Sequence, residues 1–154
     1  MLLSVTSKVL SRVILNRIAA VIDPHLRKEQ AGFRKGKSCA DHIFSLRQIL
    51  EQSNEWNTTL YANFIDFAKA FDSVHRPALW KILMHYGIPN KIISIIQMLY
   101  KEFHAKVICG TELSDSFLIR TGVRQGCLLS PLLFNLCVDW VMKTTTSQAR
   151  RGIP

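Results

Sequence analysis

Residues 64–74 read Phe-Ile-Asp-Phe-Ala-Lys-Ala-Phe-Asp-Ser-Val, and this stretch decides the expected fold. It ends a segment, 58–66, in which residues at every second position would share one face, as in a β-strand. We therefore expect a strand that ends at Asp66, with its carboxylate at the edge of a sheet. Carboxylate oxygens are ligands suited to Mg²⁺. In a purely structural alternative, Asp66 starts a turn and Asp72 or Ser73 caps the next helix.

Helical signals lie on both sides of this strand. Apolar spacing and start and stop residues predict helices over 4–22, 38–52, 77–86 and 89–103, and from 130 onward. Ser38 and Asp41 have the spacing of a capping box, and Ser130 is expected to cap the last helix. Two strands, 104–109 and 117–121, flank a turn region at Gly110-Thr111. The chain is therefore expected to be an α+β unit, helix-rich with a small and incomplete antiparallel sheet.

The composition supports one folded domain with an anionic partner. The 154 residues are 48% apolar, which is enough for a core. Lys and Arg number 20 against 11 acidic residues, a net charge of +9, which favours nucleic acid over an anionic membrane. No apolar run reaches the roughly 18 residues of a membrane span, so we expect no membrane partner.

The cysteines and histidines do not suggest a metal or nucleophilic site. Cys39, Cys109, Cys127 and Cys137 are widely spaced and show no C-x-x-C pattern. We expect buried, reduced thiols in an intracellular protein. The five histidines include no pair with zinc-ligand spacing, and no nucleophile motif is present.

Two loop segments are further candidates for binding. In 122–131, the polar Gln125 and the flexible Gly126 precede a helix start, where a backbone could approach a nucleotide. The alternative is a plain loop that leads into a helix. In 27–37, five basic residues stand beside glycines against one acid, a composition that can hold phosphates or simply form a solvated face.

Taken in order, these segments resemble the reverse-transcriptase domain of non-LTR (LINE-type) retrotransposons. Residues 30–41 are similar to that family's fingers motif, Q-x-G-F-R-x-G-x-S. Residues 64–74 resemble its palm motif A, with Lys-Ala-Phe-Asp, and 122–135 its motif B, G-x-x-Q-G-x-x-x-S-P-x-L-F-N. Residues 7–17 are similar to the helical block before the fingers motif, so the resemblance covers nearly the whole chain. It implies the fingers and part of the palm of a right-hand polymerase.

The resemblance implies roles for residues of motifs A and B. Asp66 matches the first catalytic carboxylate, which would bind two Mg²⁺ ions with the backbone carbonyl of Phe67 beside it. The metals would lower the pKa of a primer 3′-OH and neutralise the departing pyrophosphate. Phe71 matches the position that excludes a ribose 2′-OH and so favours dNTPs. Gln125 and Gly126 match residues that line the nucleotide pocket and the templating pair.

The resemblance also implies roles for residues of the basic segment 27–37. Arg34 and Lys37 match fingers positions that approach the triphosphate. Arg27, Lys28 and Lys35 are expected to contact nucleic acid. The implied partners are an RNA template, a DNA primer and a dNTP; the sequence does not indicate an oligomeric state.

The sequence departs from the family pattern in one respect. Family members carry a further palm motif, Tyr- or Phe-Ala-Asp-Asp, on a hairpin downstream of motif B, but these 154 residues contain no Asp-Asp pair. We therefore expect a fingers region at about 1–57 and a partial palm at about 58–154, truncated after motif B and without motif C and the thumb. Such a chain would lack two of the three carboxylates, and we predict that alone it does not polymerise.

Three functions remain open. The first is a fragment of an RNA-directed DNA polymerase that would add dNTPs to a primer 3′-OH in the full-length protein. The second is a catalytically dead nucleic-acid-binding module that uses its +9 charge. The third is a non-functional truncated retroelement product. Nuclear residence is expected from the family, although the sequence carries no clear localisation signal.

Overall fold

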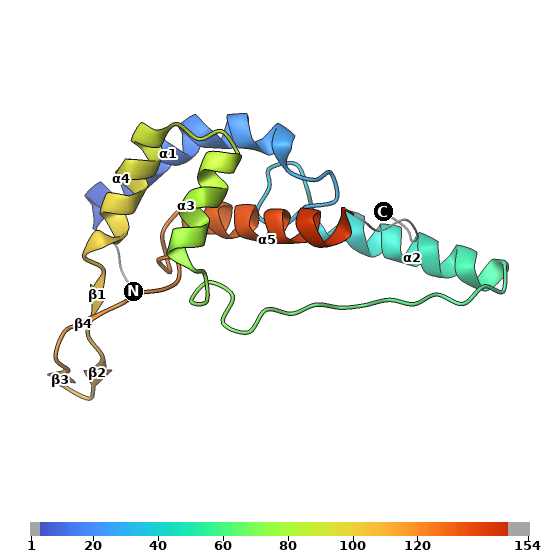
Figure 1. The fold of residues 1–154 in the computed structure, drawn as a ribbon. Helices are drawn as coiled ribbons and strands as arrows, with labels where there is room; N and C mark the ends of the chain where they lie inside the picture. The colour runs from blue at the N-terminus through green and yellow to red at the C-terminus, as the bar shows by residue number, and fades with distance from the viewer. Residues whose placement is uncertain (1–3, 148–154) are drawn as a thin grey trace.

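The computed structural model describes residues 4–147, which form a helical body with one projecting hairpin (Figure 1). The α-helices are α1 (Val5–Ile22), α2 (Cys39–Glu55), α3 (Arg76–His85), α4 (Asn90–Lys101) and α5 (Ser130–Thr146). A single 3₁₀ turn, η1 (Asp23–His25), follows α1. The short strands are β1 (His104–Ala105), β2 (Ile108–Cys109), β3 (Glu112–Leu113) and β4 (Phe117–Leu118). The described part of the chain is thus helix-rich with little sheet, as the sequence predicts.

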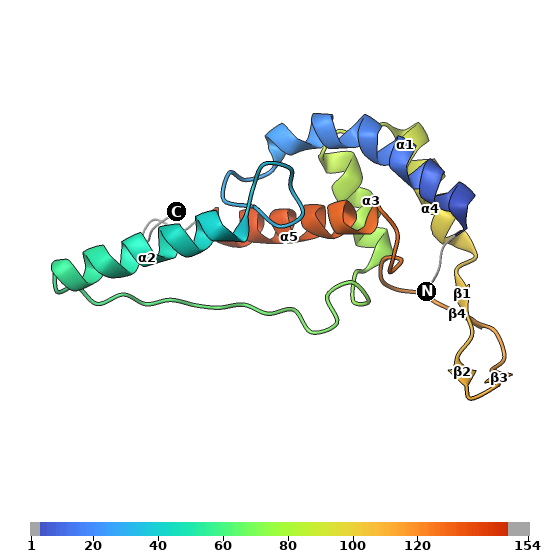
Figure 2. The same ribbon diagram turned by 180° about the vertical axis from the view of Figure 1, so that it is seen from behind.

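The core lies between α5 and the three helices α1, α3 and α4, which surround it (Figures 1 and 2). Leu133 and Leu136 of α5 are completely buried, as is Leu83 of α3. Ile18 of α1 and Ile96 of α4 reach the same cluster. Residues before and after the basic loop therefore share one core, and the burial of their apolar side chains stabilises both.

The helix boundaries follow the signals in the sequence, with one exception. Ser38 and Asp41 form the expected reciprocal capping box at the start of α2. Gly87 ends the helix that contains Pro77, with φ of +78°. The expectation that Ser130 caps α5 is wrong, because the N-cap is Leu129. The Ser130 hydroxyl lies inside the first turn and donates to the carbonyl of Arg124 at 2.5 Å.

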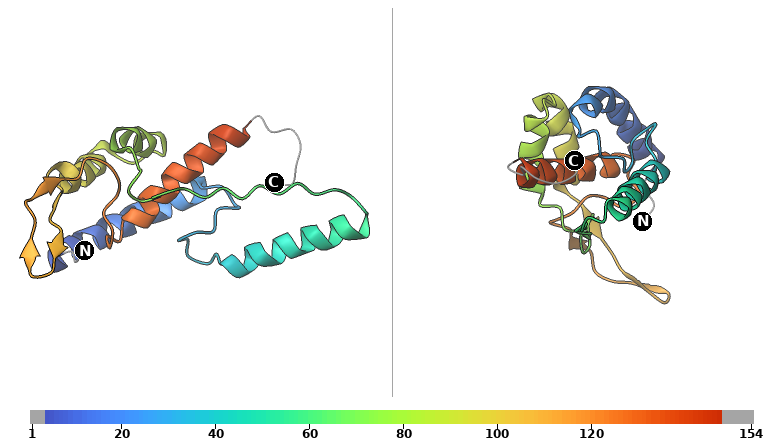
Figure 3. Two further views of the ribbon diagram at one scale, coloured as in Figure 1. Left: turned by 90° about the horizontal axis from the view of Figure 1, so that it is seen from below. Right: turned by 90° about the vertical axis from the view of Figure 1, so that its right-hand side faces the viewer.

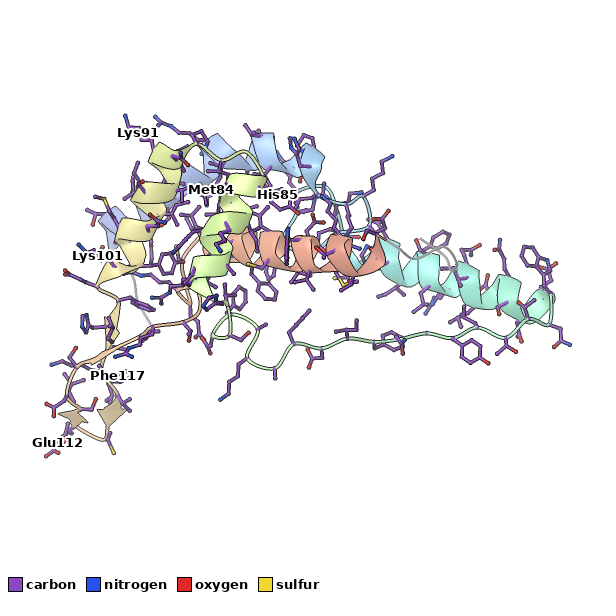
Figure 4. All side chains as sticks on the ribbon, in the orientation of Figure 1. Met84, His85, Lys91, Lys101, Glu112 and Phe117 are labelled. Atoms are coloured by element: carbon purple, nitrogen blue, oxygen red, sulfur yellow. The ribbon has the colours of Figure 1, made fainter. Side chains whose placement is uncertain are left out.

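The predicted strands 104–109 and 117–121 form only in part, as β1 and β2 within the first and β4 within the second, and the unpredicted β3 pairs with β2. The resulting hairpin extends away from the helices (Figure 1). His104 pairs with Leu118 in one antiparallel ladder, and Ile108 pairs with Leu113 in the next. Figure 4 shows Glu112 and Phe117 on this projection, far from α5. The hairpin brings Phe103 and Ile119 together at its base, where the amide of Ile119 donates to the carbonyl of Phe103 at 2.8 Å.

The predicted strand over 58–66 does not form. Residues 58–67 are extended but have no ladder partner among residues 4–147, and they run as an open segment that returns from the end of α2 (Figures 1 and 3). Tyr61, Phe64 and Ile65 are exposed, and α2 buries none of its residues. A strand requires a hydrogen-bonded neighbour, and no described segment supplies one.

The thiols are free, but the expectation that all are buried is wrong. Cys127 is buried and Cys137 is half-buried, whereas Cys39 and Cys109 are exposed. Cys39 begins α2 and Cys109 lies in β2, two elements that stand outside the core. Within residues 4–147, none of the helices combines the length and the apolar character that crossing a bilayer requires.

Candidate functional site

The loop that contains Gln125 is joined to the end of motif A by backbone hydrogen bonds. The amide of Gly122 donates to the carbonyl of Val74, and the amide of Val123 to that of Phe71, both at 2.8 Å. Gly122 has φ of +79°, and a Cβ at this residue would lie 2.7 Å from the Cα of Asp72. Only glycine permits this approach. Two segments distant in the sequence are thereby placed side by side.

This junction forms one side of a pocket of about 420 Å³. Phe71 lines it from motif A, and Phe33 lines it from the basic loop. Their rings meet edge to face with centroids 6.4 Å apart. Gln125 and Gly126 line it from motif B, with a further set comprising Arg124, Cys127, Leu128, Ser130 and Pro131. The structure thus brings together Phe71, Gln125 and Gly126, three residues that the sequence assigned to one nucleotide site.

Asp66 and Phe67 lie outside the lining of that pocket. Asp66 is exposed in the open segment and makes no ion pair with the described residues. The ring of Phe67 packs edge to face on Phe134, with centroids 6.4 Å apart, and lines a separate apolar pocket of about 220 Å³.

The described residues do not fit a two-metal centre. Across residues 4–147, no group of three or more His, Cys, Asp or Glu side chains is placed to hold a metal ion. Asp72, the next carboxylate after Asp66, instead accepts hydrogen bonds from the Gln125 side chain. One exposed carboxylate cannot hold two cations against their repulsion. We therefore assign no chemical step to a metal in this chain.

Arg34 is held inside its own loop. Its Nε and Nη2 donate to the two carboxylate oxygens of Asp23 at 2.8 and 3.1 Å, and Nη1 donates to the carbonyls of Arg27 and Gln30 at 2.8 Å. These bonds lower the pKa of Asp23. Lys37 donates to the carbonyl of Lys28 at 3.3 Å. In this conformation, Arg34 and Lys37 organise the basic loop, and neither lines the pocket of Phe71.

Two of the three residues expected to contact nucleic acid are exposed, and the third is held against the core. Lys28 and Lys35 are exposed. Arg27 is partly buried, and both its backbone amide and its Nε donate to Asp139 of α5, at 3.0 and 3.3 Å. Lys28 and Lys35 are thus available on the surface, whereas the side chain of Arg27 joins the loop to the core.

Asp139 is a completely buried carboxylate that the sequence analysis did not single out. It accepts from Arg27, from the Tyr86 hydroxyl and from Lys143, whose Nζ lies at 3.0 Å. Burial acts to raise its pKa, but these donors outweigh burial and hold the pKa below its usual value. An acidic residue inside the apolar run of α5 was the available signal, because a buried charge needs partners.

Asn135 and Arg76 also hold the site together and were missed. The amide of Asn135 donates to the carbonyl of Gly32 at 2.5 Å and its oxygen accepts from Gln30 at 3.1 Å, which joins the basic loop to α5. Arg76 is buried and donates to carbonyls of the segment before the loop, including that of Gly122 at 2.9 Å. A polar residue in an apolar helix signalled Asn135; nothing comparable signalled Arg76.

Comparison with known proteins gives a consistent result. Residues 1–153 match the family described as reverse transcriptase (RNA-dependent DNA polymerase). The chain is 30% identical over 145 residues to the Pol polyprotein of the type-2 retrotransposable element R2DM of Drosophila melanogaster, covering 94% of this chain and 14% of that protein. It is 33% identical over 99 residues to a Pol polyprotein of a type-1 retrotransposable element R2 of Popillia japonica, covering 64% and 15%.

A third relative is the transposon TX1 uncharacterized 149 kDa protein of Xenopus laevis. It is 26% identical over 138 residues, covering 90% of this chain and 11% of that protein. The chain therefore spans about a seventh or less of the length of these relatives.

Proposed function

Because the chain belongs to the reverse transcriptase (RNA-dependent DNA polymerase) family, we propose that its pocket receives the incoming dNTP of an RNA-directed DNA polymerase. The observation that carries this proposal is the junction of 71–74 with 122–123, which places Phe71 and Gln125 on one pocket. The 1–57 part, which supplies Phe33, is then the fingers portion of the site, and the remainder is a partial palm.

The pocket has the chemistry that a nucleoside requires. Phe33 and Phe71 offer aromatic faces and edges to a base or a sugar, and the Gln125 amide can both donate and accept. In this proposal the bulk of Phe71 excludes a 2′-OH. Gly126 lets the backbone approach the ligand closely.

Polymerisation is proposed for the longer protein and not for this chain alone. Asp66 is offered as one carboxylate of the catalytic set, and the 154 residues contain no Asp-Asp pair that would supply the others. An RNA template and a DNA primer are the partners that this proposal requires.

Direct binding of nucleotides tests the proposal. The chain should bind dTTP more tightly than 5-methyl-UTP, which differs from it only by the 2′-OH. Phe71→Ala should bring the two affinities close together, because the ring that excludes the 2′-OH is gone. Gln125→Ala should weaken dTTP by about tenfold through loss of a hydrogen-bonding group. Phe44→Ala and Gln48→Ala in the exposed helix α2 are the matched controls. Equal affinity for dTTP and 5-methyl-UTP in the parent chain would contradict the assignment of Phe71.

A primer-extension assay tests the prediction that the isolated chain does not polymerise. The isolated chain should add no nucleotide to a DNA primer annealed to an RNA template. Extension by the isolated chain would show that one carboxylate is sufficient or that the catalytic groups lie elsewhere.

The charge of the chain favours a second candidate, a module that binds nucleic acid without catalysis. The +9 charge and the exposed Lys28 and Lys35 support it. Its affinity for RNA should fall steeply with added salt and be unaffected by Asp66→Ala. This candidate requires no discrimination between dTTP and 5-methyl-UTP, so the same nucleotide titrations distinguish the two candidate functions.

A further inference from the structure

Two guanidinium groups flank a pair of aromatic rings behind the pocket. The Arg76 Cζ lies 5.0 Å from the centre of the Tyr100 ring and 5.7 Å from that of Phe103. The Arg124 Cζ lies 4.6 Å from the centre of Phe103 and 5.7 Å from that of Tyr100. The ion pairs of the described residues involve other cations, Arg27, Arg34 and Lys143. Two positive charges are thus held together without a described carboxylate to neutralise them.

The two arginines differ in how their donors are satisfied. Arg76 donates to the carbonyls of Tyr100, Ile119, Thr121 and Gly122. Arg124 makes no side-chain hydrogen bond with residues 4–147, and its buried Nε has no partner there. A buried donor without an acceptor costs free energy, most of all when it is charged. Arg76 therefore has a complete structural role, whereas the two Nη groups of Arg124 are accessible and make no hydrogen bond to the described residues, and its Nε is enclosed by protein.

The position of Arg124 decides where that acceptor would lie. Arg124 lines the 420 Å³ pocket next to Gln125 and Gly126, and no acidic side chain lines that pocket. Asp72 is turned to the Gln125 amide. Burial lowers the pKa of Arg76, and the nearby like charge of Arg124 acts in the same direction. An anion in the pocket would offset these like charges.

We propose that Arg124 is a phosphate-binding residue of the pocket, with its guanidinium against the ring of Phe103 and its Nη groups directed to phosphate oxygens. This inference rests on the proposed function and extends it, because it assigns the group that receives the anion. The contact with the ring limits the movement of the guanidinium, and its two Nη groups can bind a phosphate in a bidentate manner. The phosphate belongs either to a nucleoside triphosphate or to the backbone of a nucleic acid strand.

Four probes separate the chemistry from its source: inorganic tripolyphosphate, dTTP, thymidine and a short single-stranded oligodeoxythymidylate. Arg124→Gln should lower the affinity for tripolyphosphate about 10- to 100-fold, the effect of losing a charge-assisted hydrogen bond. Thymidine should be unaffected. If the affinity of this variant for dTTP falls in parallel, the phosphate is that of the nucleotide. If its affinity for the oligonucleotide falls while that for dTTP is unchanged, the phosphate is that of a strand. Both outcomes support phosphate binding by Arg124.

Arg120→Gln is the matched control, because it removes the same charge from an exposed arginine four residues away. The proposal is overturned if Arg124→Gln weakens the phosphate probes no more than Arg120→Gln does, or if it weakens thymidine as much as dTTP. If the parent chain binds tripolyphosphate through Arg124 but binds dTTP no more tightly than tripolyphosphate, the inference about Arg124 stands. The proposal that the pocket receives a nucleotide is then contradicted.

Protection from chemical modification needs no variant and so does not depend on whether Arg124→Gln folds. Phenylglyoxal modification, located by mass spectrometry, should be slowed at Arg124 and unchanged at Arg120 when tripolyphosphate is present. Equal modification of Arg124 with and without tripolyphosphate overturns the proposal.

Discussion

The Gln125 side-chain amide donates to both carboxylate oxygens of Asp72, at 3.2 and 3.4 Å. Both side chains are exposed, so the bond competes with water and contributes little to stability. The hydrogen bond acts mainly by positioning, because it holds the side chain of Gln125, which lines the pocket, toward motif A. A ligand can replace this contact at small cost.

Asp72→Ala should therefore lower the free energy of unfolding by less than about 1 kcal/mol. Urea denaturation at neutral pH measures this change. Asp115→Ala, at another exposed carboxylate, is the control. A loss of several kcal/mol specific to Asp72 would show that the contact with Gln125 is a structural one.

Gly122→Ala should destabilise the chain by about 3 kcal/mol or more, because the added Cβ meets the backbone of Asp72 as well as an unfavourable φ. Gly87→Ala is a matched control: its φ of +78° is nearly the same, but nothing lies within 4 Å of the new Cβ. It should cost about 1 kcal/mol. Denaturation of the two variants in urea gives the difference due to contact alone. Equal losses would refute the close approach of the two motifs.

Stability should fall on acidification through Asp139. Its pKa is lowered in the folded state, so the carboxylate stabilises the fold above its unfolded pKa of about 3.9. That contribution is lost as pH falls through the lower folded value. Thermal unfolding followed from pH 7 down to about pH 2 should show this loss in the parent chain, beginning as the pH nears the unfolded pKa and continuing below it.

Asp139→Asn should be less stable at pH 7 and should lose less on acidification, because the titrating group is gone. Asp115→Asn, which changes an exposed carboxylate, should leave the pH profile close to that of the parent. Identical acid profiles for the parent and Asp139→Asn would contradict the assigned role of Asp139.

The four thiols should divide into two classes on alkylation. Burial raises the pKa of Cys137 to about 11, so little thiolate is present near neutral pH, and Cys127 is shielded from the reagent. Cys39 and Cys109 are exposed and should react with iodoacetamide in the native chain. Mass spectrometry should find these two modified first, and all four after denaturation. Early modification of Cys137 would show that α5 is not packed as described.

The sequence predicted the helices well because their signals are local. Apolar spacing and the Ser38–Asp41 box identify α1 and α2 without reference to the rest of the chain. The strand over 58–66 failed for the opposite reason, since pairing depends on a neighbour and not on alternation alone. Similarly, Ser130 is a good cap by residue type, but it is the first residue of α5 and Leu129 occupies the N-cap position.

The site was predicted in part. Phe71, Gln125 and Gly126 meet on one pocket, as their motifs suggested. The bonds of Arg34 to Asp23 and of Arg27 to Asp139 depend on how the basic loop folds back, which no spacing in the sequence reveals. The residues around Arg124 give it no role in the sequence, because its position depends on Phe103 and Tyr100, which tertiary structure brings to it.

The open segment 58–67 has a consequence for handling the purified protein. Beyond Thr58, which is bonded to Ser53, its backbone amides and carbonyls have no ladder partner within residues 4–147, and the rings of Tyr61 and Phe64 are exposed beside them. Such a segment is a template on which further copies can stack by intermolecular pairing, in the manner of fibril growth. Aggregation through the open segment should therefore limit the solubility of the protein at high concentration. A proline within the segment should delay the onset of turbidity in concentrated solutions.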